Sequence, residues 1–497
     1  MSRTKNAIKI VISSGLNQFV LVVAGLILPP LIISTYGSEM NGLVNSVKQI
    51  LGYFSVFSVG LGAAGQVALY EPLHKQEWNK INNIISEIAI FLNRVGVVFA
   101  IFISCYAFVL PVIRDDNCDY GTVMGIVLIC GLGNLIEFVY LTRYKILLAA
   151  DQKQFIVSSV YTQGTILNTI LSVILIYYEA PILLVQFAAT FAYLVRMLLL
   201  RTKVHRIYPL LNTNKDIVEN NIPNTRQALL YKLSEIIINC IPVTVVTFIC
   251  GYIDVSVYSV YNLVFSSIAM IVQIFATGLA ATFGNQIAQK DYKTLKSSFK
   301  GYNFVFRTLS FFFYICSAIL IVPFVSVYIS NSDGVNYLLP TVGIMFAVHG
   351  ICRMIRIPYI TLVDAVGNYE ENNKANYVEV VVNIIFSVVL TLRWGMIGVL
   401  VSGALTALYR SILFMIKINK NMLQFSNVKE VFVIIMNFLL GLFMCMIFKN
   451  ISVNSYFDWF VLAIKIAGIC GGSCLVLNIA LDREGCKELL IRIIRKR

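Results

Sequence analysis

Long apolar runs, separated by short polar loops, constrain this chain more than any other feature of its sequence. A run of about 20 residues with few charges is long enough to cross the ~30 Å hydrocarbon core of a bilayer as a helix. Hydropathy gives about 14 such runs, and no linker between them is long enough to hold a soluble domain. The expected spans are 8–34, 42–70, 84–113, 121–149, 155–177, 182–202, 228–250, 255–283, 299–329, 338–363, 374–392, 396–418, 430–448 and 458–481. The sequence therefore predicts an all-α polytopic membrane protein.

The composition agrees with this prediction. Hydrophobic residues make up 58% of the chain and charged residues only 13%, whereas about a quarter of an average soluble protein is charged. The net charge of +14 would also suit nucleic acid, but the basic residues of membrane proteins concentrate in cytoplasmic loops and meet anionic lipids. We therefore expect anionic membrane lipids, and no nucleic acid, as partners. Most of the 11 cysteines lie in apolar runs, and no metal-ligand spacing is present, so we expect no disulfide framework, metal or other cofactor.

The distribution of Lys and Arg among the loops predicts the orientation of the chain in the membrane. One alternate set of loops, together with both ends of the chain, holds nearly all of the basic loop residues. The intervening loops hold only Arg114, Arg393 and Lys449. Both termini are therefore expected in the cytoplasm. The N-terminal apolar run is too long for a cleavable signal peptide and is expected to form the first membrane helix.

The two halves of the chain repeat at a shift of roughly 215 residues, a pattern that indicates internal duplication in transporters. LNTILSVIL at 167–175 matches VNIIFSVVL at 382–390. Two pairs of arginines fall at matching positions, Arg196 with Arg410 and Arg143 with Arg356. Both halves begin on the cytoplasmic side and contain an even number of spans, which predicts two parallel-repeat six-helix bundles around a central cavity, followed by two C-terminal helices. The expected boundaries are 1–202 for the first bundle, 203–226 for a cytoplasmic linker, 227–418 for the second bundle, and 419–497 for helices 13 and 14 with a basic tail.

Two short motifs raise the question of enzymatic activity. Gly60–Gly65 fits the dinucleotide-binding pattern G-x-G-x-x-G, but that pattern requires a preceding strand, and here it ends an apolar run. Close helix packing is the favoured interpretation of these glycines. Asp115 and Asp116 lie in an outer loop, where membrane glycosyltransferases can carry acidic residues, but the chain lacks the large extracytoplasmic surface of such enzymes. We therefore predict that the protein is not an enzyme.

Ionisable residues within the spans are the candidate functional residues, because charges in hydrocarbon are costly unless they face a cavity or a partner. His349, Arg353 and Arg356 follow an i, i+4, i+7 spacing and share one helix face. Glu137 and Lys145 also fit one face. Basic groups within the spans outnumber acidic ones: Lys48, Arg94, Arg143, Lys145, Arg196, Lys232, Arg307, Arg353, Arg356 and Arg410 against Glu87, Glu137, Glu235 and Glu379. This balance suits an anionic cargo, and arginine suits phosphate through bidentate hydrogen bonds.

The candidate site residues follow from the same argument. The candidates for cargo binding are Arg353, Arg356, Arg143, Arg196, Arg410 and Lys48. The candidates for ion coupling are Glu137, Glu235, Glu379 and His349. Protonation or ion binding at these groups would change the charge of the cavity and bias one access state. The alternative for Arg143, Arg196 and Arg410 is that each side chain extends to the cytoplasmic interface and binds nothing.

A motif near the start of the chain and the order of the spans carry a family resemblance. The motif is YGSEMNGL at Tyr36–Leu43, with ALYEPL at 68–73, and the spans follow a six, six and two pattern. On these features the chain resembles the Wzx-type polysaccharide (O-antigen or capsule) flippases of the multidrug/oligosaccharidyl-lipid/polysaccharide exporter superfamily. The resemblance implies alternating-access transport of undecaprenyl-pyrophosphate-linked oligosaccharide from the cytoplasmic to the outer leaflet of the bacterial inner membrane. It also implies H+ or Na+ as candidate coupling ions, and a polysaccharide polymerase and chain-length proteins as candidate partners.

Other functions stay open on the sequence alone. The related lipid II flippases carry arginines in their first span, where this chain has Asn17 and Gln18, so we do not expect lipid II as the cargo. A multidrug or small-solute antiporter of the same superfamily is the first alternative, and the basic interior disfavours it. A membrane polymerase or glycosyltransferase is the second, and a non-transporting component of an assembly complex is the third. The sequence does not identify the sugars of the cargo.

Overall fold

The structure is a computed structural model in which every regular element among the described residues is a helix, which confirms the all-α fold. The described residues are 3–113, 118–212, 225–277, 283–284, 286–287, 289–329, 334–366, 369–449 and 451–495. Within them, 12 helices are long and apolar enough to cross a membrane. One of these, Lys9–Lys75, has 67 residues and contains the first two expected spans, and a shorter apolar helix, Leu233–Ile249, covers the seventh. Each expected span therefore coincides with a helix over its described residues.

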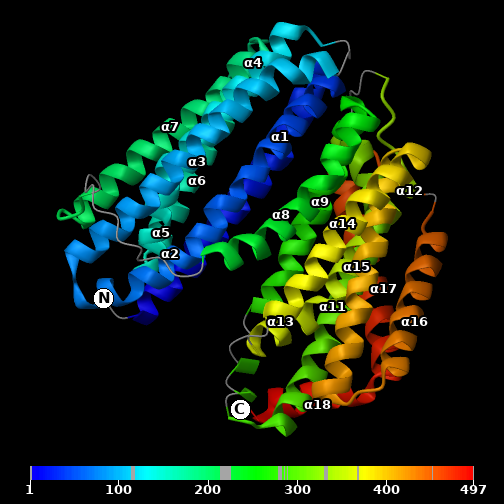
Figure 1. The fold of residues 1–497 in the computed structure, drawn as a ribbon. Helices are drawn as coiled ribbons and strands as arrows, with labels where there is room; N and C mark the ends of the chain where they lie inside the picture. Colours follow the sequence, from blue (N-terminus) through cyan, green and yellow to red (C-terminus); the bar gives the residue numbers. More distant parts are fainter. Residues whose placement is uncertain are drawn as a thin grey trace. The chain divides into compact units, whose positions relative to one another are not determined.

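The chain divides into two compact units, Met1–Ser256 and Val257–Arg497. In the first unit, α3 packs against α4, α4 against α7, α7 against α6, and α6 against α1 (Figure 1). One large cluster of buried aliphatic and aromatic side chains stabilises this arrangement. The helices are α1 (Arg3–Leu51), α2 (Ser55–Lys75), α3 (Trp78–Ile113), α4 (Tyr120–Ile136), α5 (Thr142–Ala150), α6 (Gln154–Tyr177), α7 (Ile182–Ile207) and α8 (Thr225–Ile249).

Glycines shape the beginning of the first unit. α1 bends at Gly37, whose φ of 85° and ψ of 165° are not helical and are accessible to glycine because it has no Cβ. This bend lies where the sequence predicts a turn between the first two spans. The Gly60–Gly65 motif lies inside α2 and follows a helix, which excludes the dinucleotide interpretation. A Cβ on Gly65 would lie 2.9 Å from Ile88 and 3.1 Å from Ile146, so this glycine allows close packing of α2 against α3 and α5, as predicted.

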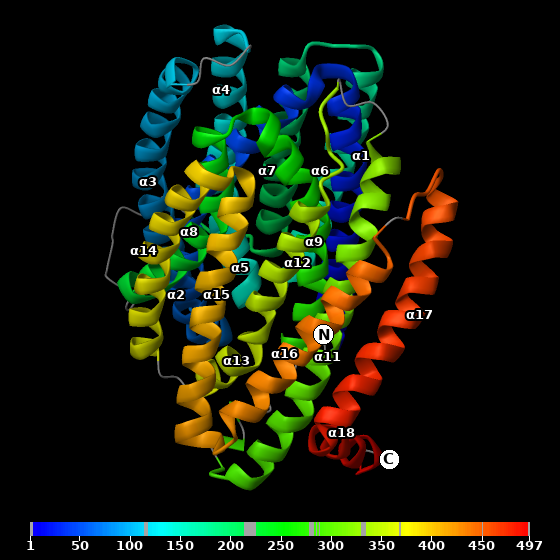
Figure 2. The same cartoon turned by 90° about the vertical axis from the view of Figure 1, so that its right-hand side faces the viewer.

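The second unit repeats the packing order of the first. α11 packs against α12, α12 against α15, and α15 against α14, which corresponds to α3, α4, α7 and α6 and is expected of a duplicated chain. The C-terminal helices α16, α17 and α18 pack against α11 (Figure 2). The helices are α9 (Tyr252–Thr277), which begins in the first unit, and α11 (Tyr292–Tyr328), α12 (Pro340–Ile355), α13 (Ile357–Val366), α14 (Tyr369–Trp394), α15 (Met396–Ile418), α16 (Asn427–Ile447), α17 (Tyr456–Leu481) and α18 (Arg483–Arg495).

Helix α8 is grouped with the first unit, although the sequence analysis assigns it to the second bundle. It packs against α2 and against the 3₁₀ turn η1 (Gly52–Phe54) that joins α1 to α2. Residues 213–224 of the expected linker, and the loop residues Asp115 and Asp116, lie outside the described residues. The expected boundaries of the two bundles, and the central cavity, stay predictions.

In both units the helix that carries candidate charged residues is interrupted. In the first unit, a π-helical turn, η2 (Glu137–Leu141), separates α4 from α5. In the second unit, α12 gives way to α13 at Arg356. Pro358 follows two residues later, and it has no N–H to donate to the carbonyl of Met354. Interruptions of this kind redirect side chains, and π turns are frequent at functional sites.

Candidate functional site

Three charged residues of the second unit, each no more than 12% exposed, form a group here called the Glu379 group (Arg356, Glu379 and Arg410). Glu379 lies on α14, with 2% of its side chain exposed, between Arg356 at the end of α12 and Arg410 on α15. Its Oε1 accepts a hydrogen bond of 2.8 Å from Arg356 Nη1, and its Oε2 accepts one from Arg410 Nη1. One carboxylate therefore neutralises only one of two arginines, and the group has a net positive charge.

Two further candidates lie on the same helix as Arg356. His349 and Arg353 occupy preceding turns of α12, as the i, i+4, i+7 spacing predicts. Arg353 lies within electrostatic range of Arg356 and Glu379. A Cβ on Gly403 of α15 would lie 2.8 Å from His349 Nε2, so this glycine makes room for the imidazole between α12 and α15.

The first unit contains a second group, here called the Glu137 group (Glu137, Lys145 and Tyr161). Glu137 Oε1 accepts hydrogen bonds from Lys145 Nζ at 2.9 Å and from the Tyr161 hydroxyl at 2.8 Å. Lys145 Nζ also donates to the Tyr161 oxygen at 3.2 Å. The predicted shared face of Glu137 and Lys145 is confirmed. The π turn that begins at Glu137 lies between the two residues.

Arg196, on α7, lies beside this group but has a different set of contacts. Its Nη2 donates to Thr165 Oγ1 at 3.0 Å. Its guanidinium carbon lies 5.0 Å from the ring centroids of both Tyr161 and Tyr193, within the range of cation–π attraction. A Cβ on Gly164 would lie 2.2 Å from Arg196 Nε. The missing side chain at Gly164 therefore lets the arginine lie across α6.

A cavity of about 520 Å³ adjoins the Glu137 group. Lys145 and Tyr161 contribute to its wall, together with Asn17 from α1 and the side chains of Gln66 and Gln154. Lys145 is the one ionisable cation among its described lining residues, and amides and hydroxyls supply most of its other polar groups. The cavity therefore combines one positive charge with donors and acceptors that suit the phosphate and hydroxyl groups of a glycosylated ligand.

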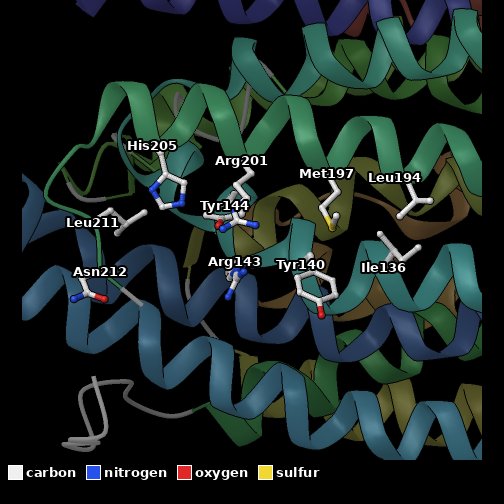
Figure 3. Close-up of a pocket in the computed structure, with 10 residues that line it drawn as sticks. All are labelled: Ile136, Tyr140, Arg143, Tyr144, Leu194, Met197, Arg201, His205, Leu211 and Asn212. Carbon is white, nitrogen blue, oxygen red and sulfur yellow. The ribbon is translucent and has the colours of Figure 1, made fainter. Parts of the chain in front are cut away.

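Arg143 faces a different cavity, of about 660 Å³, between α5 and α7. Figure 3 shows Arg143 in this cavity, with Arg201 and His205 entering it from α7. Arg143 and Lys145 are two residues apart and line different cavities. The predicted cargo-binding arginines of the first unit, Arg143 and Arg196, are therefore not brought together in one group.

Other charged candidates lie apart from both groups. Lys48 on α1 and Glu235 on α8 have exposed side chains. Arg307, which counts toward the basic excess within the spans, binds Glu430 Oε2 at 2.9 Å and Asp482 Oδ2 at 2.7 Å. Because two carboxylates surround it, Arg307 stabilises the packing of α16 and α17 on α11 and adds no net positive charge to a binding site. The side chain of Lys232 lies outside the described residues.

The uncharged members of the site do not stand out among the ionisable residues of the sequence. Tyr161, Gly164 and Thr165 share one face of α6, but a search confined to ionisable residues does not find them. His205 falls in the expected linker 203–226, whereas α7 extends to Ile207 and places both Arg201 and His205 in the wall of a cavity. A helix-face search that includes tyrosine, threonine and glycine would have found the α6 residues.

Comparison with known proteins identifies the fold. No family model matches this chain, and no curated protein matches its sequence. An inward-facing MATE family multidrug transporter of the MOP superfamily matches with a TM-score of 0.63 and 15% identity, over 81% of this chain and 95% of its own. The lipid II flippase MurJ, in an inward closed conformation, matches with a TM-score of 0.62 and 14% identity, over 97% and 99% of the two chains.

A third match has the same fold. It is a MOP superfamily transporter from Pyrococcus furiosus, described as having a binding pocket of reversed polarity, with a TM-score of 0.57 and 14% identity over 86% of this chain and 98% of its own. At these identities the matches establish the architecture of the chain. The protein therefore has the fold that the MATE transporters share with MurJ.

Proposed function

We propose that this protein is a flippase that moves undecaprenyl-pyrophosphate-linked oligosaccharide repeat units from the cytoplasmic to the outer leaflet of the bacterial inner membrane. The single observation that carries this proposal is the excess of positive charge on buried or half-buried side chains in both units, in a fold that known transporters share. Arg356 and Arg410 share one carboxylate, and Arg196 donates to a hydroxyl, lies over two aromatic rings and is within electrostatic range of Glu137, which already pairs with Lys145. Guanidinium groups in this setting suit a pyrophosphate, which offers several charged acceptors.

The extent of the structural matches favours a lipid-linked cargo over a small solute. The match to the lipid II flippase covers 97% of this chain, whereas the match to the inward-facing MATE transporter covers 81%. A polyprenyl tail can stay in the lipid while the charged head group passes through the protein. Because Asn17 lines the 520 Å³ cavity where a first-span arginine would be expected for lipid II, we propose an oligosaccharide other than lipid II.

The Glu379 group suggests how cargo and ion binding are coupled. Glu379 occupies the two arginines that a pyrophosphate would bind, so the carboxylate and the cargo compete. Protonation of Glu379 would release Arg356 and Arg410 and favour the cargo-binding state, and deprotonation would favour release. In this scheme H+ is the coupling ion, and Glu137 and His349 are secondary candidates for the proton-binding residue. Arg353 adds positive charge on α12, the helix that ends at Arg356.

The proposal is tested by a translocation assay in proteoliposomes. A fluorescent undecaprenyl-pyrophosphate oligosaccharide is incorporated, and its exposure to an external quencher is followed at different pH gradients. We expect protein-dependent translocation that falls in the Arg356→Ala variant and is retained in Arg393→Ala, a control at an exposed arginine of α14. Translocation that is equal in wild type and Arg356→Ala would remove the Glu379 group from the mechanism.

A second function is favoured by one observation, the TM-score of 0.63 to a multidrug MATE transporter. Carboxylates such as the half-buried Glu137 would then bind a cationic substrate. The same proteoliposomes distinguish the two functions when they are loaded with a cationic dye. Export of the dye without movement of the lipid-linked oligosaccharide would favour the antiporter.

A further inference from the structure

The 660 Å³ cavity between α5 and α7 is not used by the proposed transport mechanism. Arg143, Arg201 and His205 line it, and no carboxylate is among its described lining residues. Tyr144 and Ile136 form its buried floor, while Arg201 and His205 are exposed at its rim. A concave site with two guanidinium groups and no acidic neighbour in its wall attracts anions.

Arg143 is positioned to bind such an anion. Its guanidinium carbon lies 4.9 Å from the centroid of the Tyr144 ring and 5.7 Å from that of Tyr140. These aromatic contacts fix the plane of the guanidinium. The side chain of Arg143 lines the cavity, and no ion pair of this residue with a carboxylate occurs among the described residues. The charge of its guanidinium is therefore not neutralised within the cavity wall, and a bound anion would neutralise it.

One end of the cavity is formed by the segment that follows α7. The Asn82 side chain of α3 holds this segment, because its Nδ2 donates to Leu210 O at 3.1 Å and its Oδ1 accepts from Asn212 N at 3.0 Å. The Tyr208 hydroxyl donates to Asp151 Oδ2 at 2.5 Å. Burial and this hydrogen bond to a carboxylate raise the pKa of Tyr208 above its ordinary value. Leu211 and Asn212, which line the cavity, are thus held by specific contacts on both sides.

The surface beside the cavity suits a lipid. Tyr140 at the cavity and Leu198 on α7 are 46% and 55% exposed. Basic pockets between membrane helices bind phosphate-bearing lipid head groups, with the acyl chains lying along the neighbouring apolar surface. We propose that this cavity binds the phosphate of an anionic phospholipid head group between Arg143 and Arg201, as a site separate from the cargo site. Free phosphate offers the same chemistry, and the experiment below distinguishes the two sources.

The test measures ligand-dependent thermal stability. Protein washed in neutral detergent is titrated with phosphatidylglycerol, with phosphatidylcholine, or with inorganic phosphate, and the shift of the unfolding midpoint gives an apparent affinity. We expect stabilisation by phosphatidylglycerol and none by phosphatidylcholine. The Arg143→Ala/Arg201→Ala variant should lose about a hundredfold in apparent affinity, about tenfold for each charge-assisted hydrogen-bonding group. The matched control, Arg393→Ala/Lys465→Ala, removes two exposed positive charges elsewhere and should respond like wild type.

Each outcome decides the proposal. Inorganic phosphate could stabilise the wild type as strongly as phosphatidylglycerol does, and only when both arginines are present. This result would support an anion site but overturn the lipid as its ligand, in favour of a soluble phosphate. Equal responses of wild type and the double variant to every ligand would overturn the site. If the double variant does not fold, Met197→Trp places a bulkier side chain in the wall of the same cavity without removing charge, and it should weaken the phosphatidylglycerol response. An unchanged response in Met197→Trp would also overturn the proposal.

Discussion

The two units place an arginine on equivalent helix pairs but give it different partners. On α6 and α7, Arg196 donates to the hydroxyl of Thr165, and on α14 and α15, Arg410 donates to the carboxylate of Glu379. Both pairs are separated by 31 residues. The arginine thus recurs in the two halves of the chain, while the side chain to which it donates is neutral in one unit and anionic in the other. Arg196 senses the Glu137 carboxylate only at longer range.

This difference predicts different roles for the two arginines. A guanidinium held by a hydroxyl and aromatic faces keeps its charge available to an incoming anion. A guanidinium held by a buried carboxylate becomes available only when that carboxylate is protonated or displaced. On this reasoning Arg196 is available to an anion at any pH, whereas the availability of Arg410 depends on pH. The following predictions test this asymmetry, from the largest expected effect to the smallest.

Glu379→Gln should cause the largest loss of stability. It leaves Arg356 and Arg410 buried beside each other without a counter-charge, and breaking a buried ion pair costs about 3–5 kcal/mol. The measurement is thermal or denaturant unfolding of the purified protein in detergent. Glu71→Gln, at an exposed pair with Lys75, is the control and should unfold like wild type. A Glu379→Gln protein that is as stable as wild type would mean that the carboxylate does not hold the second unit together.

Arg196→Ala should separate transport from stability. Translocation should fall by about tenfold or more, because a charge-assisted contact to the cargo is lost, while stability changes less than in Arg410→Ala. Arg410→Ala also alters the environment of the buried Glu379. Both variants are compared in proteoliposomes at equal protein levels, and Arg196→Lys should retain part of the activity. A larger stability loss in Arg196→Ala than in Arg410→Ala would mean that Arg196, and not Arg410, has the structural role.

Gly164→Ala should destabilise the first unit through Arg196. The added Cβ would lie 2.2 Å from Arg196 Nε and 2.5 Å from its Cγ, and overpacking of this kind typically costs about 1–3 kcal/mol. The control is Gly468→Ala in α17, where a Cβ meets no atom within 4 Å. Unfolding of the two variants is measured side by side. Equal stabilities would show that Arg196 relaxes away from α6 without cost.

Thr165→Glu should make the first unit resemble the second. The introduced carboxylate would pair with Arg196, so translocation near neutral pH should fall several-fold, in line with a net gain of about 1 kcal/mol or more for a charged hydrogen bond. Lower pH should restore activity, because protonation of the carboxylate releases the arginine. Thr165→Gln, which adds the same bulk without the charge, is the matched control. Activity that falls in both variants without a pH-dependent recovery would indicate a steric effect.

Tyr161→Phe should have the smallest effect. It removes one hydrogen bond to Glu137, while the ion pair from Lys145 stays at 2.9 Å. The expected loss of stability is about 1 kcal/mol, with a modest decrease in translocation. Tyr409→Phe, at an exposed tyrosine of α15, should be neutral. A loss of translocation in Tyr161→Phe as large as that in Arg196→Ala would mean that the Tyr161 hydroxyl is as important for transport as Arg196.

Local sequence patterns predicted the helices and the residues that share a helix face. The spacing of Glu137 and Lys145 predicted their shared face, and the ion pair confirms it. His349, Arg353 and Arg356 lie along one helix as expected. Helical periodicity is a local property, so it can be read from a single sequence. The partners of Glu379 could not be predicted this way, because Arg356 and Arg410 lie 23 and 31 residues away on other helices.

The sequence by itself determined that this chain forms apolar helices and indicated that its two halves repeat. The length of the hydrophobic runs and the spacing of the arginines can be read from the sequence without knowledge of any tertiary contact. It also indicated an excess of positive charge within the spans. Only the tertiary structure decided which charges are neutralised. The way the helices face one another places Glu379 between two arginines and Arg307 between two carboxylates. It also directs Arg143 and Lys145 toward different cavities. Those contacts depend on packing between helices, including the space that Gly164 leaves for Arg196. A count of charges along the sequence cannot predict them.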